Sequence, residues 1–341
     1  MRVLHIDNIM IRRYGATKVS TGRKLYNGLI RGNHKVIEFS DRDIANYEAP
    51  FRIRNLGLII ANRRLVETCD NFRPEFILLG HCDIISNKSL LEIKRLVPAV
   101  KIAYRNVDPL WETRNIDKIR LRMPVVDAIF VTTGGDTLKQ FRTGSNMVAY
   151  IPNPADPSIE DQDNSAKNYF DRDLLFCGVG NPTDDRYGFV RDLHAALDGK
   201  LKFDSFGIHG AAAVWGKKYD DVLAGSKMGL NLNRFEGWPL YSSARISQLM
   251  GNGILTFLSS KGRLQRFFSD KHAVFFDTID DLIIKVLEYN ADDARRRETA
   301  GTGRKFYQEH FSGRRVAQFI IETTLEMNFS HDYIWRDELY R

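Results

Sequence analysis

Residues 174–186 read Leu-Leu-Phe-Cys-Gly-Val-Gly-Asn-Pro-Thr-Asp-Asp-Arg, an apolar run followed by a loop with two glycines and a polar segment. This order predicts a buried strand over 174–177, a loop through Gly178 and Gly180, and a helix after it. Such a strand, loop and helix form the first half of the β-α-β unit from which parallel sheets are built. The stretch therefore indicates an α/β fold.

The same alternation of short apolar runs and longer amphipathic stretches continues along the chain in both directions. Before residue 150, predicted strands cover 3–6, 36–39, 76–79, 101–104 and 128–131. After residue 173, they cover 174–177, 203–206, 228–232, 254–258 and 273–276. Each set is enough for one Rossmann-like, doubly wound parallel sheet.

A proline-rich segment, 151–158, and a polar run without apolar periodicity, 160–173, separate the two sets. Both are typical of linkers. We expect a first domain over 1–152, a linker over 153–173 and a second domain over 174–324. Because parallel sheets bind ligands beyond the C-terminal ends of their strands, two domains facing a central cleft suit two substrates or a two-part ligand.

The composition excludes several classes of protein. The chain has 341 residues, of which 43% are apolar and 27% charged, so it is neither disordered nor collagen-like. Its cysteines, Cys69, Cys82 and Cys177, lack C-x-x-C spacing, which argues against a disulfide framework and a thiolate zinc site. We find no apolar run of signal-peptide or membrane-span length, and we expect a cytoplasmic protein.

The net charge of +7 raises the question of an anionic partner. The basic residues form no stripe interleaved with aromatic residues, so we expect no nucleic acid partner. Basic residues do gather around the loop 14–23, which joins the first strand to a helix, and they suit an anionic acceptor; they are Arg12, Arg13, Lys18, Arg23 and Lys24. The loop is not G-x-G-x-x-G, which argues against a nicotinamide enzyme. A flexible surface loop remains the alternative.

Polar residues cluster again after the strand 228–232. Asn233, Arg234 and Glu236 follow this strand, and a helix predicted from Ser242, with Ser242 or Ser243 as its N-cap, carries Arg245 in its first turn. A diphosphate at this place would meet a helix N-terminus and a guanidinium together.

Several motifs resemble one protein family. In the second half they are RISQLMGNG at 245–253, FF at 267–268, VFFD at 274–277 and the predicted helix 291–310. In the first half they are YRNVDP at 104–109, VDAIFVTT at 126–133 and YIP at 150–152. Together they resemble the CgeB-like glycosyltransferases, GT-B proteins related to the retaining nucleotide-sugar transferases, over residues 1 to about 320.

This resemblance implies a GT-B fold and the metal-independent, retaining transfer of a hexosyl or deoxyhexosyl group. The second domain would bind a nucleotide diphosphate sugar as co-substrate, with no tightly bound cofactor. The first would bind a cell-envelope glycan, lipid-linked or protein acceptor. From the basic residues around the loop 14–23, and not from the resemblance, we expect an acceptor at the inner membrane face and a peripheral contact with that face. Segment 325–341 would pack back on the first domain as a helix.

The resemblance also implies a set of site residues. The expected donor-binding residues are Gly178, Gly180, Asn181, Arg186, His209, Asn233, Tyr241, Ser242 and Gln248. The expected catalytic residues are Asp108, Glu236 and Arg245.

One position departs from the pattern of the broader retaining family, which carries two glutamates eight residues apart. Gln248 stands at the second of these positions and Leu240 at the first, so Glu236 would take over from a longer loop. Gln248 can hydrogen-bond a ribose but carries no charge. A Gln248 that only caps or packs is the alternative.

Other candidates carry alternatives too. Asp108, after the fourth strand, would be a general base or orient the acceptor, unless it is a turn residue before proline; His81 is a second base candidate. His209 would face the donor, unless it is a buried histidine with its hydrogen bonds satisfied. Three Asp-x-Asp pairs, at 41/43, 161/163 and 171/173, lie in polar loops, and we predict no metal site.

Two other functions stay open. A nucleotide-sugar epimerase would need paired carboxylates and a histidine at the cleft. A non-catalytic protein that binds glycans or nucleotides would keep the fold without the chemistry, with Gln248 as its mark.

Overall fold

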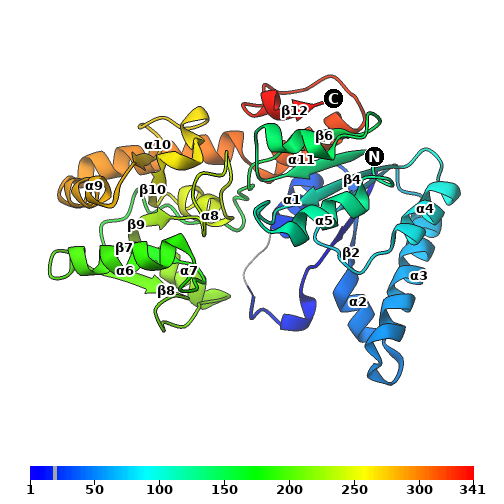
Figure 1. The fold of residues 1–341 in the computed structure, drawn as a ribbon, viewed down its shortest axis with the longest axis horizontal. Coiled ribbons are helices and arrows are strands. Elements are labelled where there is room, and N and C mark those ends of the chain that lie inside the picture. The colour runs from blue at the N-terminus through cyan, green and yellow to red at the C-terminus, as the bar shows by residue number, and fades with distance from the viewer. Residues whose placement is uncertain (18–20) are drawn as a thin grey trace. The chain divides into compact units, whose positions relative to one another are not determined.

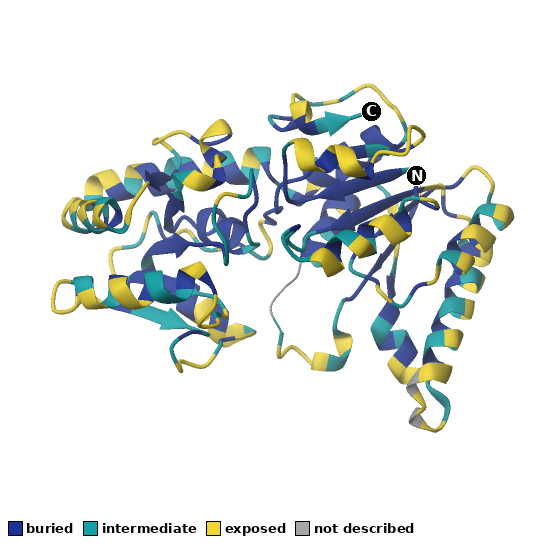
Figure 2. Cartoon of the chain, viewed as in Figure 1, coloured by how far each residue is buried: buried dark blue, intermediate teal, exposed yellow. Residues whose placement is uncertain are grey.

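The structure, a computed structural model, describes residues 1–17 and 21–341, so the predicted acceptor contact Lys18 lies outside the described residues. The chain divides into two compact units (Figure 1). The first unit consists of Met1–Pro152 and Gly313–Arg341, and the second of Asn153–Ser312. Each unit contains one sheet, and most strands in both are buried (Figure 2).

The first unit has a seven-stranded sheet in the order β12-β6-β5-β4-β3-β1-β2, in which β12 alone runs antiparallel to its neighbour among the described strands. The strands are β1 Arg2–Asp7, β2 Lys35–Ser40, β3 Phe76–Leu79, β4 Lys101–Asn106, β5 Ala128–Val131, β6 Met147–Tyr150 and β12 Leu339–Tyr340. Every residue of β3 and β5 is buried, because both faces of the sheet are covered. The sequence predicted the first five strands but not β6 or the two-residue β12.

Helices and 3₁₀ turns complete this unit. The helices are α1 Thr21–Arg31, α2 Asp41–Tyr47, α3 Arg54–Phe72, α4 Asn87–Leu96, α5 Thr113–Arg122 and α11 Gly313–Thr324. The 3₁₀ turns are η1 Ile11–Arg13, η2 Pro50–Arg52, η3 Asp136–Phe141 and η6 Arg336–Glu338.

Helix α11 belongs to the first unit, so the predicted second domain, which ended at 324, was too long. The reason is close packing against α1: a Cβ atom at Gly28 would lie 2.2 Å from the carbonyl carbon and oxygen of Gly313. On the sheet side, the ring of Phe319 meets that of Phe130 on β5 at 6.1 Å. A helix adjacent in sequence to the second unit thus buries its apolar face in the first.

The segment after α11 packs in the first unit through aromatic side chains rather than as a helix. Tyr333 and Trp335 are buried against Phe319, with ring centroids 5.0 and 5.6 Å away. The Tyr333 hydroxyl donates to the buried Glu322 carboxylate at 2.8 Å. These contacts lead the chain to β12, which pairs with β6.

The second unit has a five-stranded parallel sheet in the order β11-β10-β9-β7-β8. The strands are β7 Arg172–Cys177, β8 Phe203–Phe206, β9 Ser226–Asn231, β10 Leu255–Ser259 and β11 Val274–Phe276. The helices are α6 Asp185–Leu197, α7 Lys217–Ala224, α8 Arg245–Gly251, α9 Ile279–Ala291 and α10 Asp293–His310, and the 3₁₀ turns are η4 Ser260–Gly262 and η5 Leu264–Arg266. Neighbouring residues of β7 face different apolar cores, Phe176 one and Leu175 the other, so both faces of this sheet are covered as well.

The polar segment 160–173 is not a free linker but part of the second unit. Asn164 is fully buried, and its amide donates to the carbonyls of Leu223 and Ser226, each at 2.8 Å. The fully buried Arg296 of α10 donates to the carbonyl of Asn164 at 3.2 Å. The segment lacks apolar periodicity because its own polar groups anchor it.

Helix α8 begins at Arg245, three residues later than predicted, and Ser242 does not cap it. The Ser242 hydroxyl instead accepts a hydrogen bond from the Asn231 amide at 3.0 Å. The N-cap position is Ala244, so the prediction of Ser242 or Ser243 as the cap was wrong. The end of β9 binds the Ser242 hydroxyl instead.

Two carboxylates of α2 lie in opposite environments. Burial raises the pKa of Asp41 to about 7, and one of its oxygens, Oδ2, has no hydrogen-bond donor within the described residues. Burial would also raise the pKa of Asp43, but hydrogen bonds from Ser40 and from the N–H groups of Arg12 and Ile11 lower it.

The contact between α1 and α11 predicts the effect of a single methyl group. Gly28→Ala should destabilise the protein by about 2 kcal/mol or more, since the backbone of α11 must move. Gly188→Ala is the matched control, because Gly188 also lies inside a helix but its added Cβ would meet nothing closer than Arg191 at 3.9 Å. The control should be stabilising by up to about 1 kcal/mol in thermal unfolding. Equal effects of the two changes would contradict this packing.

The carboxylates of α2 predict opposite pH dependences. The folded pKa of Asp41 lies above its unfolded value, so the folded state holds the extra proton and loses stability as the pH rises from about 4 to about 7. Asp41→Asn should therefore stabilise the protein more at pH 8 than at pH 5, by about 2 kcal/mol. Asp43→Asn should destabilise it at pH 8. Denaturant titrations at both pH values test this, and a gain for Asp41→Asn that is independent of pH would refute it.

Candidate functional site

The strongest cluster of predicted site residues lies at the C-terminal ends of β7 and β9, which are neighbours in the second sheet. Arg245, the first residue of α8, is buried there. Its Nε donates to the carbonyl of Cys177 at 2.5 Å and its Nη1 to the carbonyl of Leu232 at 2.9 Å. The guanidinium also lies over the ring of Phe176 at 4.7 Å. Arg245 thus links the loops that follow both strands.

A second guanidinium, that of Arg186 in the first turn of α6, approaches the same place. A Cβ atom at Gly178 would lie 2.6 Å from Nη2 of Arg245 and 3.5 Å from Nη1 of Arg186. Arg186 also donates to the carbonyl of Val179. Gly178 therefore leaves the space in which the two guanidinium groups lie. A glycine is required at position 180 for a different reason: a Cβ atom there would lie 2.6 Å from the Ile208 side chain.

The two guanidinium groups leave an excess of buried positive charge. Burial lowers the pKa of Arg245. Burial, with the charges of Arg245 and Arg234, lowers the pKa of Arg186 to about 10, against the opposing effect of Asp184. The Nε of Arg186 lies 3.7 Å from Asp184 and has no hydrogen-bond acceptor in the described part of the chain. A multiply charged anion would relieve both the repulsion and the unmet hydrogen bond.

Arg186 also lines a cavity of about 140 Å³ that contains Glu236. Burial raises the pKa of Glu236, against hydrogen bonds from Ser259 and from the N–H of Asn233. The cavity is lined by Asp185, Arg186, Phe189, Leu232, Glu236, Ser259, Lys261, Phe276 and Asp277. Lys261 was missed by the sequence analysis because it follows β10 in a 3₁₀ turn with no motif. The structure thus joins an acidic group of raised pKa to the cationic cluster.

His209 and Asn181 lie beside this cluster. The His209 ring lies against that of Tyr187, the residue after Arg186, with centroids 4.1 Å apart and the ring planes tilted by 41°. The His209 Nε2 is buried and has no hydrogen-bond partner among the described residues. His209 is therefore not the histidine with satisfied hydrogen bonds that the alternative requires. The N–H of Asn181 donates to the Asp184 carboxylate at 3.0 Å.

Other predicted donor residues bind neighbours within the second unit. Gln248 is buried, and its Oε1 accepts the hydroxyl proton of Tyr219 at 2.8 Å, as expected for the packing alternative. The Asn233 amide donates to the carbonyl of the buried Tyr241 at 3.1 Å.

In the first unit, Asp108 follows β4 and lies 3.6 Å from Nδ1 of His81, with about a third of each side chain exposed. The Asp108 N–H donates to Asn106 Oδ1 at 2.8 Å, which fixes the turn. The structure therefore brings together the two base candidates of the sequence analysis.

A buried ion pair between Asp7 and Arg105, which the sequence patterns did not indicate, lies next to His81. Burial alone would raise the pKa of Asp7, at the end of β1, but Arg105 and His5 hold it well below its usual range. Asp7 also accepts the His81 N–H at 3.1 Å. A Cβ at Gly80 would lie 2.3 Å from Asp7 Oδ2. Two features of the sequence could have indicated this pair: an aspartate, Asp7, at the end of a strand, and a glycine, Gly80, directly after another strand.

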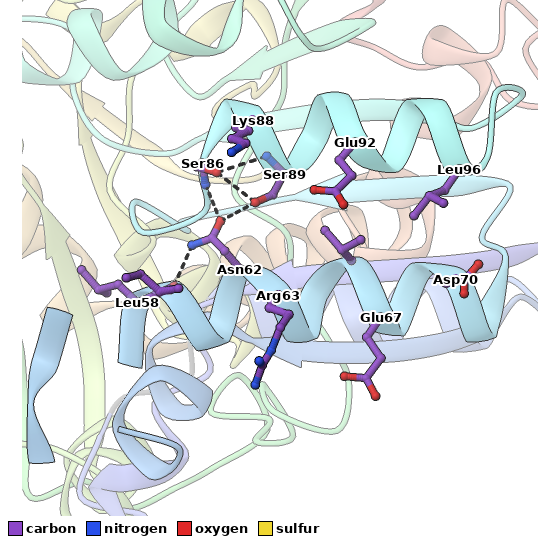
Figure 3. A pocket seen from close by; sticks show the side chains of 12 residues that line it. Leu58, Asn62, Arg63, Glu67, Asp70, Ser86, Lys88, Ser89, Glu92 and Leu96 are labelled. Carbon is purple, nitrogen blue, oxygen red and sulfur yellow. Dashed lines mark hydrogen bonds between the residues drawn. The ribbon is translucent and has the colours of Figure 1, made fainter. Parts of the chain in front are cut away.

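A cavity of about 710 Å³ lies between α3 and α4 (Figure 3). Its polar residues bind one another: Asn62 Oδ1 accepts the Ser86 N–H at 2.8 Å and the Ser89 hydroxyl at 2.9 Å. We assign this groove no role in the chemistry.

Two kinds of feature are absent from residues 1–17 and 21–341. Within these ranges, no three or more His, Cys, Asp or Glu side chains are grouped so that they could hold a metal ion. Within them too, every helix is too short or too polar to span a membrane.

The comparisons with known proteins agree with this architecture. A family model described as "Glycosyl transferase-like" matches residues 186–322, a range that includes Arg186, Glu236 and Arg245. No protein among those of curated function matches the chain.

Solved structures match almost the whole chain at low identity. Alr3699/HepE from Anabaena, solved with UDP, is 13% identical with a TM-score of 0.56, over 96% of this chain and 100% of that chain. Sucrose-phosphate synthase from Thermosynechococcus elongatus is 12% identical with a TM-score of 0.54, over 96% and 98%. A UDP-N-acetylglucosamine 2-epimerase, described as putative, from Listeria monocytogenes is 11% identical with a TM-score of 0.50, over 98% and 99%. This chain has the GT-B fold.

Proposed function

We propose that this protein is a glycosyltransferase that takes a sugar from a nucleotide diphosphate sugar bound by the second unit. The single observation that carries the proposal is the pair of buried guanidinium groups of Arg186 and Arg245 at Gly178. Burial and the charges of Arg245 and Arg234 lower the pKa of Arg186 against the opposing effect of Asp184, and a diphosphate is the anion that such a pair accommodates. The family match over 186–322 supports the same class of reaction.

The chemistry follows from where charge develops. When the bond between sugar and diphosphate breaks, negative charge grows on the leaving group, and Arg186 and Arg245 are already in place to stabilise it. Glu236, which shares a cavity with Arg186, would bind a sugar hydroxyl. Burial raises the pKa of Glu236, and its carboxyl oxygens can accept hydrogen bonds from a sugar hydroxyl. Retention of configuration and metal independence are part of the proposal.

The remaining donor contacts are assigned in the same proposal. Gly178, Gly180 and Asn181 would border the sugar or the phosphates, and His209 would face the donor. Tyr241, Ser242 and Asn233 belong to the loop before α8 and would lie near the nucleoside. Gln248 contributes through Tyr219, as a positioning residue.

The first unit would bind the acceptor, a cell-envelope glycan, a lipid-linked sugar or a protein. Asp108 and His81, 3.6 Å apart, would orient or deprotonate the acceptor hydroxyl. Arg12 and Arg23 already pair with Asp43 and Glu38, so an anionic acceptor would share them with these carboxylates.

Nucleotide binding tests the proposal directly. Calorimetric titration with UDP, GDP, ADP and CDP should find one that binds, and UDP comes first because HepE was solved with it. Arg186→Met should weaken binding by about tenfold to a hundredfold, the loss expected of a charge-assisted hydrogen bond. Arg191→Met is the matched control, since Arg191 lies on the same helix with its side chain 67% exposed. No binding of any nucleotide would refute the proposal.

The same variant separates a binding role from a structural one. Because Arg186 is desolvated and repelled by Arg245, Arg186→Met should raise the thermal stability of the protein without ligand while it lowers affinity. A loss of stability together with unchanged affinity would show that Arg186 only supports the loop.

Turnover tests Glu236. Glu236→Gln should keep nucleotide affinity within about twofold but lower the release of nucleoside diphosphate from the bound sugar donor by about a hundredfold, as for an acid–base group. Glu288→Gln, at an exposed site of the same unit, is the control. Mass spectrometry of the products distinguishes transfer from epimerisation, and an epimerised donor would contradict the proposed reaction.

A further inference from the structure

Large apolar side chains are exposed together at one corner of the first unit. They come from η1, α2, η2 and the start of α3, and we call them the apolar corner: Ile11, Tyr14, Tyr47, Phe51, Ile53 and Leu56. Phe51 is 93% exposed, Tyr14 87% and Tyr47 54%. Exposed apolar residues are ordinary when single, but a group of this size marks an interaction surface.

The four segments that carry these side chains are also close to one another in space. The N–H of Ile11 donates to Asp43 of α2 at 2.8 Å, and Tyr14 lies close enough to Tyr47 to contribute, after burial, to the raised pKa of Tyr47. Helix α3 lies against α2 where a Cβ at Gly57 would touch the Ala45 carbonyl. Figure 1 shows the turn between α2 and α3 at the tip of a helical hairpin that points away from the sheet of its own unit.

Phe51 occupies this tip in a left-handed backbone conformation, with φ of +53°. For a residue with a side chain this conformation costs about 1–2 kcal/mol. The Phe51 ring is almost fully exposed, so no contact within the chain offsets this conformational cost. A partner outside the chain would offset it.

The charge around the apolar corner is positive. Residues 11–14 and 41–64 contain seven arginines and three acidic residues, Asp41, Asp43 and Glu48. Asp41 and Asp43 are buried, and Asp43 pairs with Arg12. Glu48 pairs with Arg64, and outside these ranges Glu67 also pairs with Arg64 and Asp83 with Arg42. Arg13 and Arg63 are exposed and form no ion pair with any described residue.

We infer that the apolar corner docks on an anionic lipid bilayer. Aromatic and aliphatic side chains at a protruding tip enter the interface between headgroups and acyl chains, and arginines around them attract anionic headgroups. Tyrosine and phenylalanine favour this interface, and unpaired arginines add to affinity only where the partner is negatively charged. The inference does not depend on the proposed transfer reaction.

Vesicle co-sedimentation tests the inference with the full chain. Mixed phosphatidylcholine and phosphatidylglycerol vesicles should bind the protein, whereas pure phosphatidylcholine vesicles or raised salt should reduce binding by about tenfold. Phe51→Asp should lower binding to the mixed vesicles by about tenfold or more, and Arg63→Glu by a smaller factor. Tyr169→Asp, 79% exposed in the second unit, and Arg142→Glu, exposed in the first, are the matched controls.

Other outcomes overturn the inference. Equal binding of Phe51→Asp and Tyr169→Asp would show that the corner is not the contact. Equal binding to neutral and anionic vesicles would remove the role of charge. Dimerisation of the unaltered protein, abolished by Phe51→Asp, with no vesicle binding would assign the surface to a second copy of the chain. Nucleotide affinity, measured on the same variants, should not change, which keeps this test separate from that of the proposed function.

Discussion

The contact on which the second unit depends is the approach of the Arg245 guanidinium to the backbone between β7 and α6. Its hydrogen bonds to the carbonyls of Cys177 and Leu232 link the loops after two neighbouring strands. This approach requires a residue without a side chain at 178. The same geometry leaves Arg186 close to Arg245 in a poorly solvated place, where each charge disfavours the other. Buried like charges are costly, and a protein keeps them where an anion completes the arrangement.

The first unit also buries charged side chains at a strand end, but there the charges have opposite signs. Asp7 and Arg105 neutralise each other at the end of β1, and Gly80 leaves room for the carboxylate. The carboxylate and the guanidinium of this pair compensate each other's charge, and its effect is structural: Asp7 holds the N–H of His81 and with it the side chain beside Asp108. One unit thus carries an unbalanced buried charge and the other a balanced one.

The predicted strands could be read from the sequence because a strand buried on both faces is a continuous apolar run, as at Phe76–Leu79. Segments held by polar contacts were misjudged. Residues 160–173 looked like a linker because nothing in a sequence shows that Asn164 will bind two carbonyls 59 and 62 residues away. Helix α11 was assigned to the wrong unit because its partner, α1, lies at the other end of the chain.

The sequence by itself determined the α/β class, two parallel sheets and the presence of polar residues at strand ends. These are local properties, since periodicity and turn residues act over a few positions. Only the tertiary structure decided which polar residues meet. Arg245 and Arg186 are 59 positions apart, and the added Cβ at Gly178 that would touch both belongs to a third segment. The tertiary structure also decided that the Gln248 side chain would bind the hydroxyl of Tyr219. The orientation of a side chain depends on which partners the fold brings within hydrogen-bond distance, and no local pattern carries that information.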